Sequence, residues 1–308
     1  MKLYFILEGR RGPQVPGPIM TAVFDILNRR GFLIDVAITE HMVLRPELLT
    51  VHHDLYLLKS DTELALSTAG ILHAQGAQIL NPYPCCVAVK DKIIASQRLR
   101  AANIPTPRSW VTGDLALMRP LVEQFPLIIK PYRGFHGWGI HIVHNPSELA
   151  TVPTPENPVL IQEFIKESEQ DLKIYVVGDE VFATCKPFSS TSFAQPGRPH
   201  PLTDEVRNIA VRCGQVFGLG LYGLDIIEGP TGPVVVDVNC FPGYKGVPHA
   251  PSLLADYIEE YTRGRYDLDL SKLDEAKQHN DQVHKIIESP PSYKEFPKSV
   301  VPDHQHSV

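Results

Sequence analysis

The sequence predicts an α/β protein in which an open N-terminal α/β unit is followed by two α+β lobes. Over residues 1–80, short apolar runs alternate with stretches of helical periodicity, which is the pattern of βαβ units around a parallel sheet. From about residue 90, the β-forming runs come in pairs joined by turns rich in glycine or proline, which is typical of antiparallel hairpins. This change of pattern indicates more than one folding unit.

The composition is that of a globular chain. Its 308 residues are 43% hydrophobic and 21% charged, enough for two or three domains with cores of their own. The formal net charge of −6 gives no overall attraction to nucleic acid or to an anionic membrane, so an anionic ligand has to be bound by a local cluster of cations. We expect a cytoplasmic protein, because no apolar run is long enough to span a membrane, no signal peptide is visible, and the cysteines show no disulfide or Cys-x-x-Cys pattern.

In the N-terminal unit, strands are expected to alternate with helices. The first helix begins at Pro18, whose fixed φ suits a helix start, and stops at Gly31. A second helix ends at Gly76. The expected strands cover residues 1–7, 33–38, 54–58 and 77–80. The turn after the first strand lies where ligands bind such sheets, so Arg10 and Arg11 in this turn either meet an anion or are simply solvated.

In the remainder of the chain, helices are expected where apolar residues recur with helical spacing. They cover residues 89–102, 204–217 and 253–261. The expected strands are 127–130, 140–143, 159–165, 173–177 and 180–186, followed by a hairpin over 221–239. The predicted domains are a substrate-side α/β domain (1–88), a central lobe (89–165), a C-terminal lobe (166–265) and a weakly ordered tail (266–308) in which apolar periodicity fades.

The hairpin over residues 221–239 is the most informative part of the chain. If it folds symmetrically about Thr231, Asp225 faces Asp237. Asn239 then lies on the same face, because side chains alternate along a strand. Two opposed carboxylates repel each other, and with an amide oxygen they form the hard ligand set that suits Mg²⁺. The hairpin therefore predicts a metal site, with a pair of solvated aspartates as the alternative.

Lys130 ends an apolar strand, where a lysine has to meet an anion or reach water. The segment that follows it carries Gly134, Gly137 and Gly139. Glycines let backbone N–H groups approach a phosphate closely, so this loop is a candidate phosphate site, although a plain hairpin tip would look similar. It is not a Walker A loop, because no Gly-Lys-Ser/Thr follows.

The segment Gln162-Glu163-Phe164-Ile165 ends another apolar strand and leads into a polar loop. An extended segment between two lobes can offer backbone N–H and C=O groups to an adenine edge, while Phe164 and Ile165 pack on the ring.

Basic residues are also expected around an anionic small-molecule substrate. They are Lys173 and Lys186 on paired strands and Arg198, His200, Lys245 and His249 in nearby loops. We take Lys173, Lys186 and Arg198 as the candidate catalytic cations.

These motifs, in this order, resemble those of the ATP-grasp superfamily from about residue 1 to residue 263. The motifs that carry the resemblance are Asp91-Lys92, Ile104-Pro105-Thr106-Pro107, Ile129-Lys130-Pro131, the loop from Gly134 to Gly139, Gln162-Glu163-Phe164-Ile165, Asp171-Leu172-Lys173, Asp225 and Asp237-Val238-Asn239. The resemblance implies an ATP-grasp fold, in which a pre-ATP-grasp domain precedes two lobes that clamp ATP.

The resemblance also implies roles for individual residues. Lys92 and Lys130 would contact ATP phosphates, and the glycine loop would close over them. Glu163 to Ile165 would hold the adenine. Asp225, Asp237 and Asn239 would bind Mg²⁺ or Mn²⁺, which agrees with the hairpin argument.

Within this superfamily, the chain is similar to the RimK-type glutamate ligases, which share the Asp91-Lys92 helix, the glycine loop and the layout. Such enzymes transfer the γ-phosphate of ATP to a carboxylate, and an amine then attacks the acyl phosphate. The chain departs from them at Lys173, where an arginine is usual. It departs again after Lys186, where the segment that starts at Pro187 replaces an expected Asn/Arg/Gly-Gly stretch.

The chain is also similar to inositol polyphosphate kinases of the trisphosphate 5/6-kinase type. The shared features are the stretch Phe241-Pro242-Gly243-Tyr244 after the metal strand and the pair Lys186-Pro187. Our leading hypothesis is an ATP- and Mg²⁺-dependent carboxylate–amine ligase acting on an amino acid or a peptide. The alternative is a kinase that phosphorylates an inositol phosphate or a similar polyol. The sequence determines neither the acceptor nor the oligomeric state.

Overall fold

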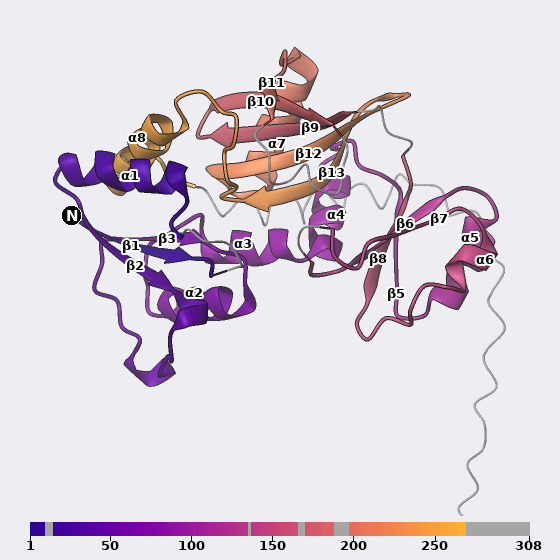
Figure 1. Ribbon diagram of the computed structural model, residues 1–308, viewed down its shortest axis with the longest axis horizontal. Helices are drawn as coiled ribbons and strands as arrows, with labels where there is room; N and C mark the ends of the chain where they lie inside the picture. Colours follow the sequence, from indigo (N-terminus) through magenta and orange to yellow (C-terminus); the bar gives the residue numbers. More distant parts are fainter. Residues whose placement is uncertain (10–14, 135–136, 166–169, 188–196, 269–308) are drawn as a thin grey trace, which may run out of the picture.

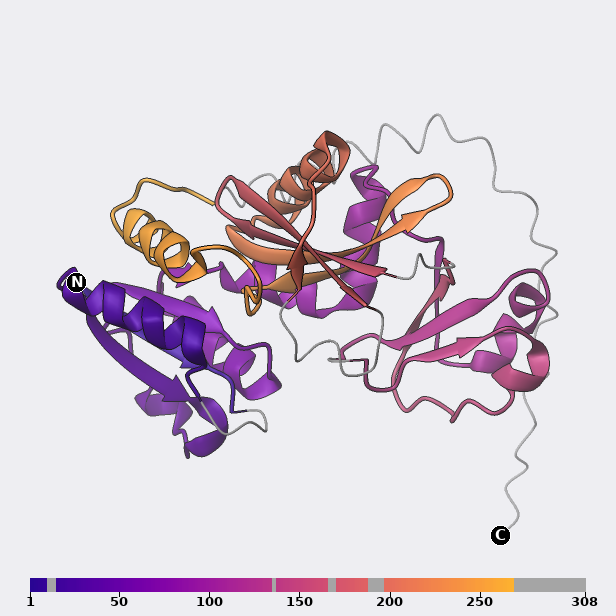
Figure 2. The same cartoon turned by 45° about the horizontal axis from the view of Figure 1, so that its top comes forward.

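The computed structural model describes residues 1–9, 15–134, 137–165, 170–187 and 197–268, which contain three β-sheets and the helices that flank them. The three sheets follow one another along the molecule, with the sheet that contains β12 and β13 in the middle (Figures 1 and 2). This arrangement is of the α/β class that the sequence predicts. Arg10, Arg11 and most of the expected tail lie outside the described residues. None of the helices in the described part is long and apolar enough to cross a membrane.

The N-terminal sheet is parallel, as predicted, with strand order β2-β1-β3-β4. Its strands and helices are β1 (Lys2–Leu7), α1 (Pro18–Arg29), β2 (Leu33–Ile38), η1 (Thr39–His41), η2 (Pro46–Leu48), β3 (Leu55–Lys59), α2 (Glu63–Ala74) and β4 (Ile79–Leu80). One face packs on α1 through Phe5 and Val23, and the other packs on α2 through Leu58 and Leu72. Since the strands are parallel, β1 and β3 end at the same edge.

The helix predicted over residues 89–102 is instead two helices. They are α3 (Tyr83–Lys90) and α4 (Lys92–Ala101). Asp91 between them has an extended backbone, and its carboxylate accepts hydrogen bonds from the N–H groups of Ile93 and Ile94. It is therefore the N-cap of α4, a feature that apolar periodicity does not reveal. The break places Lys92 in the first turn of α4, where its backbone N–H donates to the Tyr132 carbonyl at 2.8 Å.

The central lobe contains an antiparallel sheet of order β5-β8-β6-β7. Its elements are β5 (Ser109–Thr112), η3 (Leu115–Met118), α5 (Arg119–Val122), β6 (Leu127–Pro131), β7 (His141–Val143), α6 (Pro146–Leu149) and β8 (Val159–Glu163). One face, with Leu127, Ile129 and Ile161, packs on the short helices. Because side chains alternate, Lys130 and Gln162 lie on the opposite face.

The third sheet is antiparallel, with order β11-β10-β9-β12-β13. Its strands and following helices are β9 (Gln170–Val177), β10 (Glu180–Pro187), β11 (Arg198–Pro199), α7 (Asp204–Phe217), β12 (Leu221–Gly229), β13 (Gly232–Cys240) and α8 (Ala250–Thr262). One face packs on α7 through residues such as Ile174 and Leu224. The other face carries Asp225 and Asp237 toward one end and the buried Tyr175 and Leu221 toward the other.

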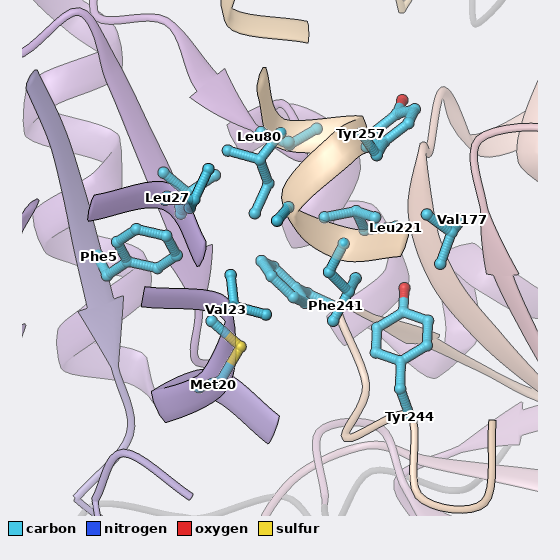
Figure 3. Close-up of a cluster of buried hydrophobic side chains, with 14 of the residues drawn as sticks. Phe5, Met20, Val23, Leu27, Leu80, Val177, Leu221, Phe241, Tyr244 and Tyr257 are labelled. Atoms are coloured by element: carbon cyan, nitrogen blue, oxygen red, sulfur yellow. The ribbon is translucent and has the colours of Figure 1, made fainter. Parts of the chain in front are cut away.

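A shared core joins the third sheet to the N-terminal sheet. Phe241, which is 1% exposed, lies between Val23 of α1 and Leu221 of β12 (Figure 3). Helix α8 packs beside α1, where Arg30 forms an ion pair with Asp256 at 2.6 Å. Helix α8 is therefore part of the same packed unit as the N-terminal sheet.

We predict that Phe241→Ala lowers the free energy of unfolding by about 3–5 kcal/mol, because the ring fills a shared core and its loss leaves a cavity. Urea unfolding followed by circular dichroism measures this loss. Val43→Ala is the control, because Val43 is 97% exposed and its truncation should change stability by less than about 0.5 kcal/mol. A loss below about 1 kcal/mol for Phe241→Ala would show that the two sheets do not depend on this core.

Candidate functional site

A cleft of about 930 Å³ opens where the N-terminal sheet, the glycine loop and the end of β13 meet. The carboxyl ends of the parallel strands β1 and β3 form one wall, which is where ligands of open α/β sheets bind. The predicted site residues that line the cleft are Lys92, Lys130, Gly134, Gly137, Asp237 and Asn239. The structure thus brings together residues from both lobes and the N-terminal unit.

Asp225 of β12 and Asp237 of β13 are directly opposite each other, as predicted. Asn239 follows on the same face, opposite Gly223. The two aspartate side chains are only partly exposed, at 21% and 28%. The described residues contain no group of three or more His, Cys, Asp and Glu side chains placed to share a metal, and the third side-chain oxygen donor on this face is the amide of Asn239.

A β-bulge sets this opposition. Near the turn, Val235 pairs with Ile226, in the register that the turn imposes. The next residue of β12, Asp225, pairs with Asp237, so Val236 is an extra residue in β13. If the strands were paired regularly, with no bulge, Val236 would face Asp225 and the Asp237 side chain would point to the core face. Buried Val235 and Val238 mark that core face on either side of the bulge. The predicted pairing is therefore right, although the hairpin is not symmetric about its turn.

Lysines neutralise both carboxylates. Lys92 Nζ lies 2.6 Å from Asp237 Oδ1, and Lys173 Nζ lies 2.8 Å from Asp225 Oδ1. The side chains are partly buried, so these ion pairs are screened less than pairs at the surface. Burial lowers the pKa of Lys92, but neighbouring carboxylates, first Asp237 and then Asp225, raise it above the usual lysine value.

Lys130 is a third cation at the pair and is only 7% exposed. Its Nζ donates to the carbonyl of the bulge residue Val236 at 3.2 Å. Burial lowers the pKa of Lys130 to about 8. Burial also acts to raise the pKa of Asp237, but the charges of Lys92 and Lys130 outweigh it and hold this pKa below the usual aspartate value. The carboxylate is therefore ionised at neutral pH.

The glycine loop lies between β6 and β7 beside this cluster. Gly137 and Gly139 have positive φ values of 75° and 72°, which glycine adopts without strain. At Gly139 a Cβ atom would lie 2.9 Å from Pro131 Cγ, so a larger residue does not fit. Gly134 and Gly137 line the cleft, whereas Gly139 supports the loop from behind. Residues 135–136 of the loop lie outside the described residues.

The predicted adenine segment, residues 162–165, does not line the cleft. The Gln162 side chain lies on the same face of the central sheet as Lys130. The N–H of Glu163 donates to the Arg108 carbonyl at 3.0 Å, and the N–H of Phe164 donates to the Pro126 carbonyl at 2.9 Å. The Glu163 carboxylate also pairs with Arg108, at 2.8 Å. The N–H groups of Glu163 and Phe164 and the Glu163 carboxylate are therefore engaged within the protein.

Gln162 is 2% exposed, and its Oε1 has no hydrogen-bond partner among the described residues. Its Nε2 donates to Ser109 Oγ at 3.2 Å. A buried oxygen without a hydrogen bond is energetically costly. Gln162 Oε1 could therefore accept a hydrogen bond from a ligand, for example from an amino group of a base.

The candidate catalytic cations are spread more widely than the sequence suggested. Lys173 lies at the carboxylate pair, while Arg198 is exposed on β11 and does not line the cleft. Lys186 lies on β10 opposite Asp171, but its side chain is outside the described part.

Sequence reasoning missed the charged residues at the end of β3. Lys59 and Asp61 line the cleft, together with Lys90 at the end of α3. The signal was available, because polar residues directly after a buried parallel strand lie at the ligand-binding edge of such a sheet.

Comparison with known proteins identifies the family of this chain. A family model described as a RimK-like ATP-grasp domain matches residues 89–253. A probable alpha-L-glutamate ligase of Rhodopirellula baltica is 30% identical over 194 residues, which cover 58% of this chain but only 48% of that protein. A probable alpha-L-glutamate ligase of Mannheimia succiniciproducens is 28% identical over 223 residues, which cover 66% of this chain and 74% of that protein.

Solved structures show the same fold. A RimK domain ATP-grasp protein of Sphaerobacter thermophilus superimposes with a TM-score of 0.69 at 17% identity, over 83% of this chain and 99% of that one. The ATP-grasp ligase PsnB, in complex with a minimal precursor, has a TM-score of 0.62 at 20% identity, over 84% and 99%. Nothing in these matches supports the kinase alternative. The chain belongs to the RimK-like ATP-grasp family of ATP-dependent carboxylate–amine ligases.

Proposed function

We propose that the protein uses ATP to join a carboxylate to the amine of an amino acid or a peptide-like substrate. The observation that carries the proposal is the opposed pair Asp225 and Asp237, flanked by three lysines beside a cleft of about 930 Å³. The relatives named above are probable glutamate ligases, and PsnB was solved with a precursor peptide, which supports this substrate class.

The donor set fits a divalent cation. Asp225, Asp237 and Asn239 offer two carboxylates and one amide oxygen on a single sheet face, and Asp237 stays ionised. Hard oxygen ligands of this kind suit Mg²⁺, and Mn²⁺ accepts the same set. A bound cation would offset the repulsion of the carboxylates and the charge of phosphate oxygens.

ATP is the nucleotide that the family uses, and the residues around the cluster fit it. The unpaired Gln162 oxygen and the Ile165 N–H would meet the adenine edge. Lys92 and Lys130 would meet phosphate oxygens, and Gly134 and Gly137 would bring backbone N–H groups close to them. Gly139 permits the loop to turn back over Pro131.

The protein's part in the chemistry is positioning and charge. A carboxylate oxygen takes the γ-phosphate, ADP leaves and an acyl phosphate forms. The amine then attacks the carboxyl carbon, and phosphate and a proton leave as the amide forms. Both steps develop negative charge on phosphate oxygens, which nearby cations would stabilise. The ammonium groups of Lys92, Lys130 and Lys173 lie around the carboxylate pair and would supply these cations. Lys173 would act as a point charge, without the flat bidentate fork that an arginine presents. Lys186 on β10 and Arg198 on β11 stay candidate cations for the substrate.

The function itself is tested by phosphate release. We expect free phosphate from ATP only when a carboxylate and an amine are both present, and a new amide by mass spectrometry. Phosphate that stays on an alcohol of a polyol would contradict a ligase and restore the kinase alternative.

We predict that Asp237→Asn lowers kcat by at least about a hundredfold at saturating Mg²⁺, because the neutral amide weakens the cation site that stabilises phosphoryl charge. Steady-state kinetics and Mg²⁺ titration by calorimetry measure the two effects separately. The control is Asp25→Asn, since Asp25 is exposed on α1 and away from the cleft. Undiminished turnover and Mg²⁺ affinity in Asp237→Asn would rule out its role as a ligand.

We predict that Lys130→Met raises the KM for ATP at least about tenfold, because a charge-assisted hydrogen bond to phosphate is lost from a buried position. The apolar replacement of similar length avoids a cavity. Lys2→Met, at the exposed start of β1, is the control. If the KM for ATP is unchanged and only the KM of the second substrate rises, the assignment of Lys130 to ATP is wrong.

A further inference from the structure

The Gln162 side chain is held by a hydrogen-bond network that the proposed function does not use. Gln162 lies on β8 directly opposite Ser109 of β5, so the two side chains share one face of the central sheet. Gln162 Nε2 donates to Ser109 Oγ at 3.2 Å, and Ser96 Oγ of α4 donates to the same oxygen at 2.9 Å. Ser109 Oγ in turn donates to the Pro107 carbonyl at 3.0 Å. Ser109 therefore joins Gln162 to the backbone at Pro107.

The Pro107 carbonyl determines the direction of these hydrogen bonds. A carbonyl oxygen only accepts, so the single hydroxyl proton of Ser109 points to it. Ser109 Oγ then has only lone pairs left for its other partners, and Gln162 has to face it with the amide nitrogen, which carries protons. The opposite orientation would place the Gln162 oxygen against the serine oxygen with no proton between them. The Gln162 amide is therefore fixed, with Nε2 toward Ser109.

The oxygen of this amide is an acceptor without a partner. Gln162 is 2% exposed, and within the described part of the chain its Oε1 accepts no hydrogen bond. Leaving a buried acceptor unpaired is costly. Rotation of the amide by 180° does not remove this cost, because it breaks the hydrogen bond to Ser109. The fold thus keeps a buried acceptor with one defined orientation.

This acceptor lies on the sheet face that carries the proposed phosphate contacts. Ile128 of β6 is directly opposite Gln162, and Lys130 follows two residues later on the same face. Two residues of a strand span about 7 Å, so Gln162 and Lys130 belong to one site. Ser96 is also one helical turn after Lys92 on the same side of α4. A nucleotide with its phosphates at Lys130 would therefore have its base near Gln162.

We propose that Ser109 is a positioning residue that sets the base specificity of the protein, because it presents Gln162 Oε1 to the exocyclic amino group of adenine. This inference rests on the proposed function. An amide that is free to rotate can offer either its oxygen or its nitrogen to a base, and Ser109 removes this choice. A base with a keto oxygen in place of the amino group would put two acceptors together, and in a buried position no water would relieve their repulsion.

Nucleotide binding tests this inference independently of turnover. The protein is titrated by calorimetry, in the presence of Mg²⁺, with the β,γ-imido analogues of ATP and of ITP, whose base has a keto oxygen where adenine has its amino group. We expect the ATP analogue to bind at least about tenfold more tightly than the ITP analogue. Ser109→Ala frees the Gln162 amide to rotate and should lower this ratio at least about fivefold, mainly through tighter binding of the ITP analogue.

The ratio of the two affinities separates positioning from stability, since a variant that only distorts the sheet weakens both analogues alike. Ser109→Thr keeps the hydroxyl group and should restore the wild-type ratio. Gln162→Leu should lower the ratio as Ser109→Ala does, but through weaker binding of the ATP analogue.

Ser96→Ala is the matched control, because it removes another buried serine of the same network. The Pro107 carbonyl still holds the Ser109 proton in this variant, so the orientation of Gln162 is kept. The ratio should therefore stay within about twofold of the wild-type value.

The proposal is overturned if the wild-type protein does not distinguish the two analogues, if Ser109→Ala or Gln162→Leu leaves the ratio unchanged, or if Ser96→Ala lowers it as much as Ser109→Ala. A protein that shows the expected ratios but forms no amide would contradict the ligase function and leave the role of Ser109 standing. A ligase whose ratio does not respond to Ser109→Ala would contradict that role alone.

Discussion

The opposition of two carboxylates on neighbouring strands is the constraint on which the site depends. Asp225 and Asp237 repel each other across a hairpin, and the ion pairs of Lys173 with Asp225 and of Lys92 with Asp237 offset this repulsion. The bulge at Val236 positions both a carboxylate and one of the lysines around it. It turns Asp237 away from the core, and it frees a carbonyl that accepts a hydrogen bond from Lys130. One extra residue thus couples a strand of the third sheet to a strand of the central sheet.

The surroundings of this cluster come from three parts of the chain. Lys92 is directed to it by the N-cap at Asp91, and Lys130 by the pleat of β6, while the shared core around Phe241 fixes the N-terminal sheet against β12 and β13. Because the core holds these parts together, the carboxyl edge of the parallel sheet and the lysines around Asp237 line a single cleft.

Charge distinguishes the two sides. The side at β13 is dominated by lysines around an ionised carboxylate pair, a charge arrangement that would suit phosphoryl oxygens and a divalent cation. The side at the N-terminal sheet mixes Lys59 and Lys90 with Asp61 and Glu8. In an acidic chain, this local arrangement rather than net charge selects the ligands.

The sequence by itself determined the α/β class and the family, since these depend on local periodicity, turn residues and motif order. It predicted that Asp225 faces Asp237 from a symmetric hairpin, whereas a bulge sets this pairing in the structure. It did not reveal the helix break at Asp91 or the bulge in β13. Apolar periodicity does not show an N-cap, and it does not show a one-residue shift in strand register that the position of the turn offsets. Roles for the glycine loop and the adenine segment stay predictions. Only the tertiary structure decided that Lys59 and Asp61 share the cleft with Asp237, because contacts between residues far apart in the chain arise from packing of separate sheets.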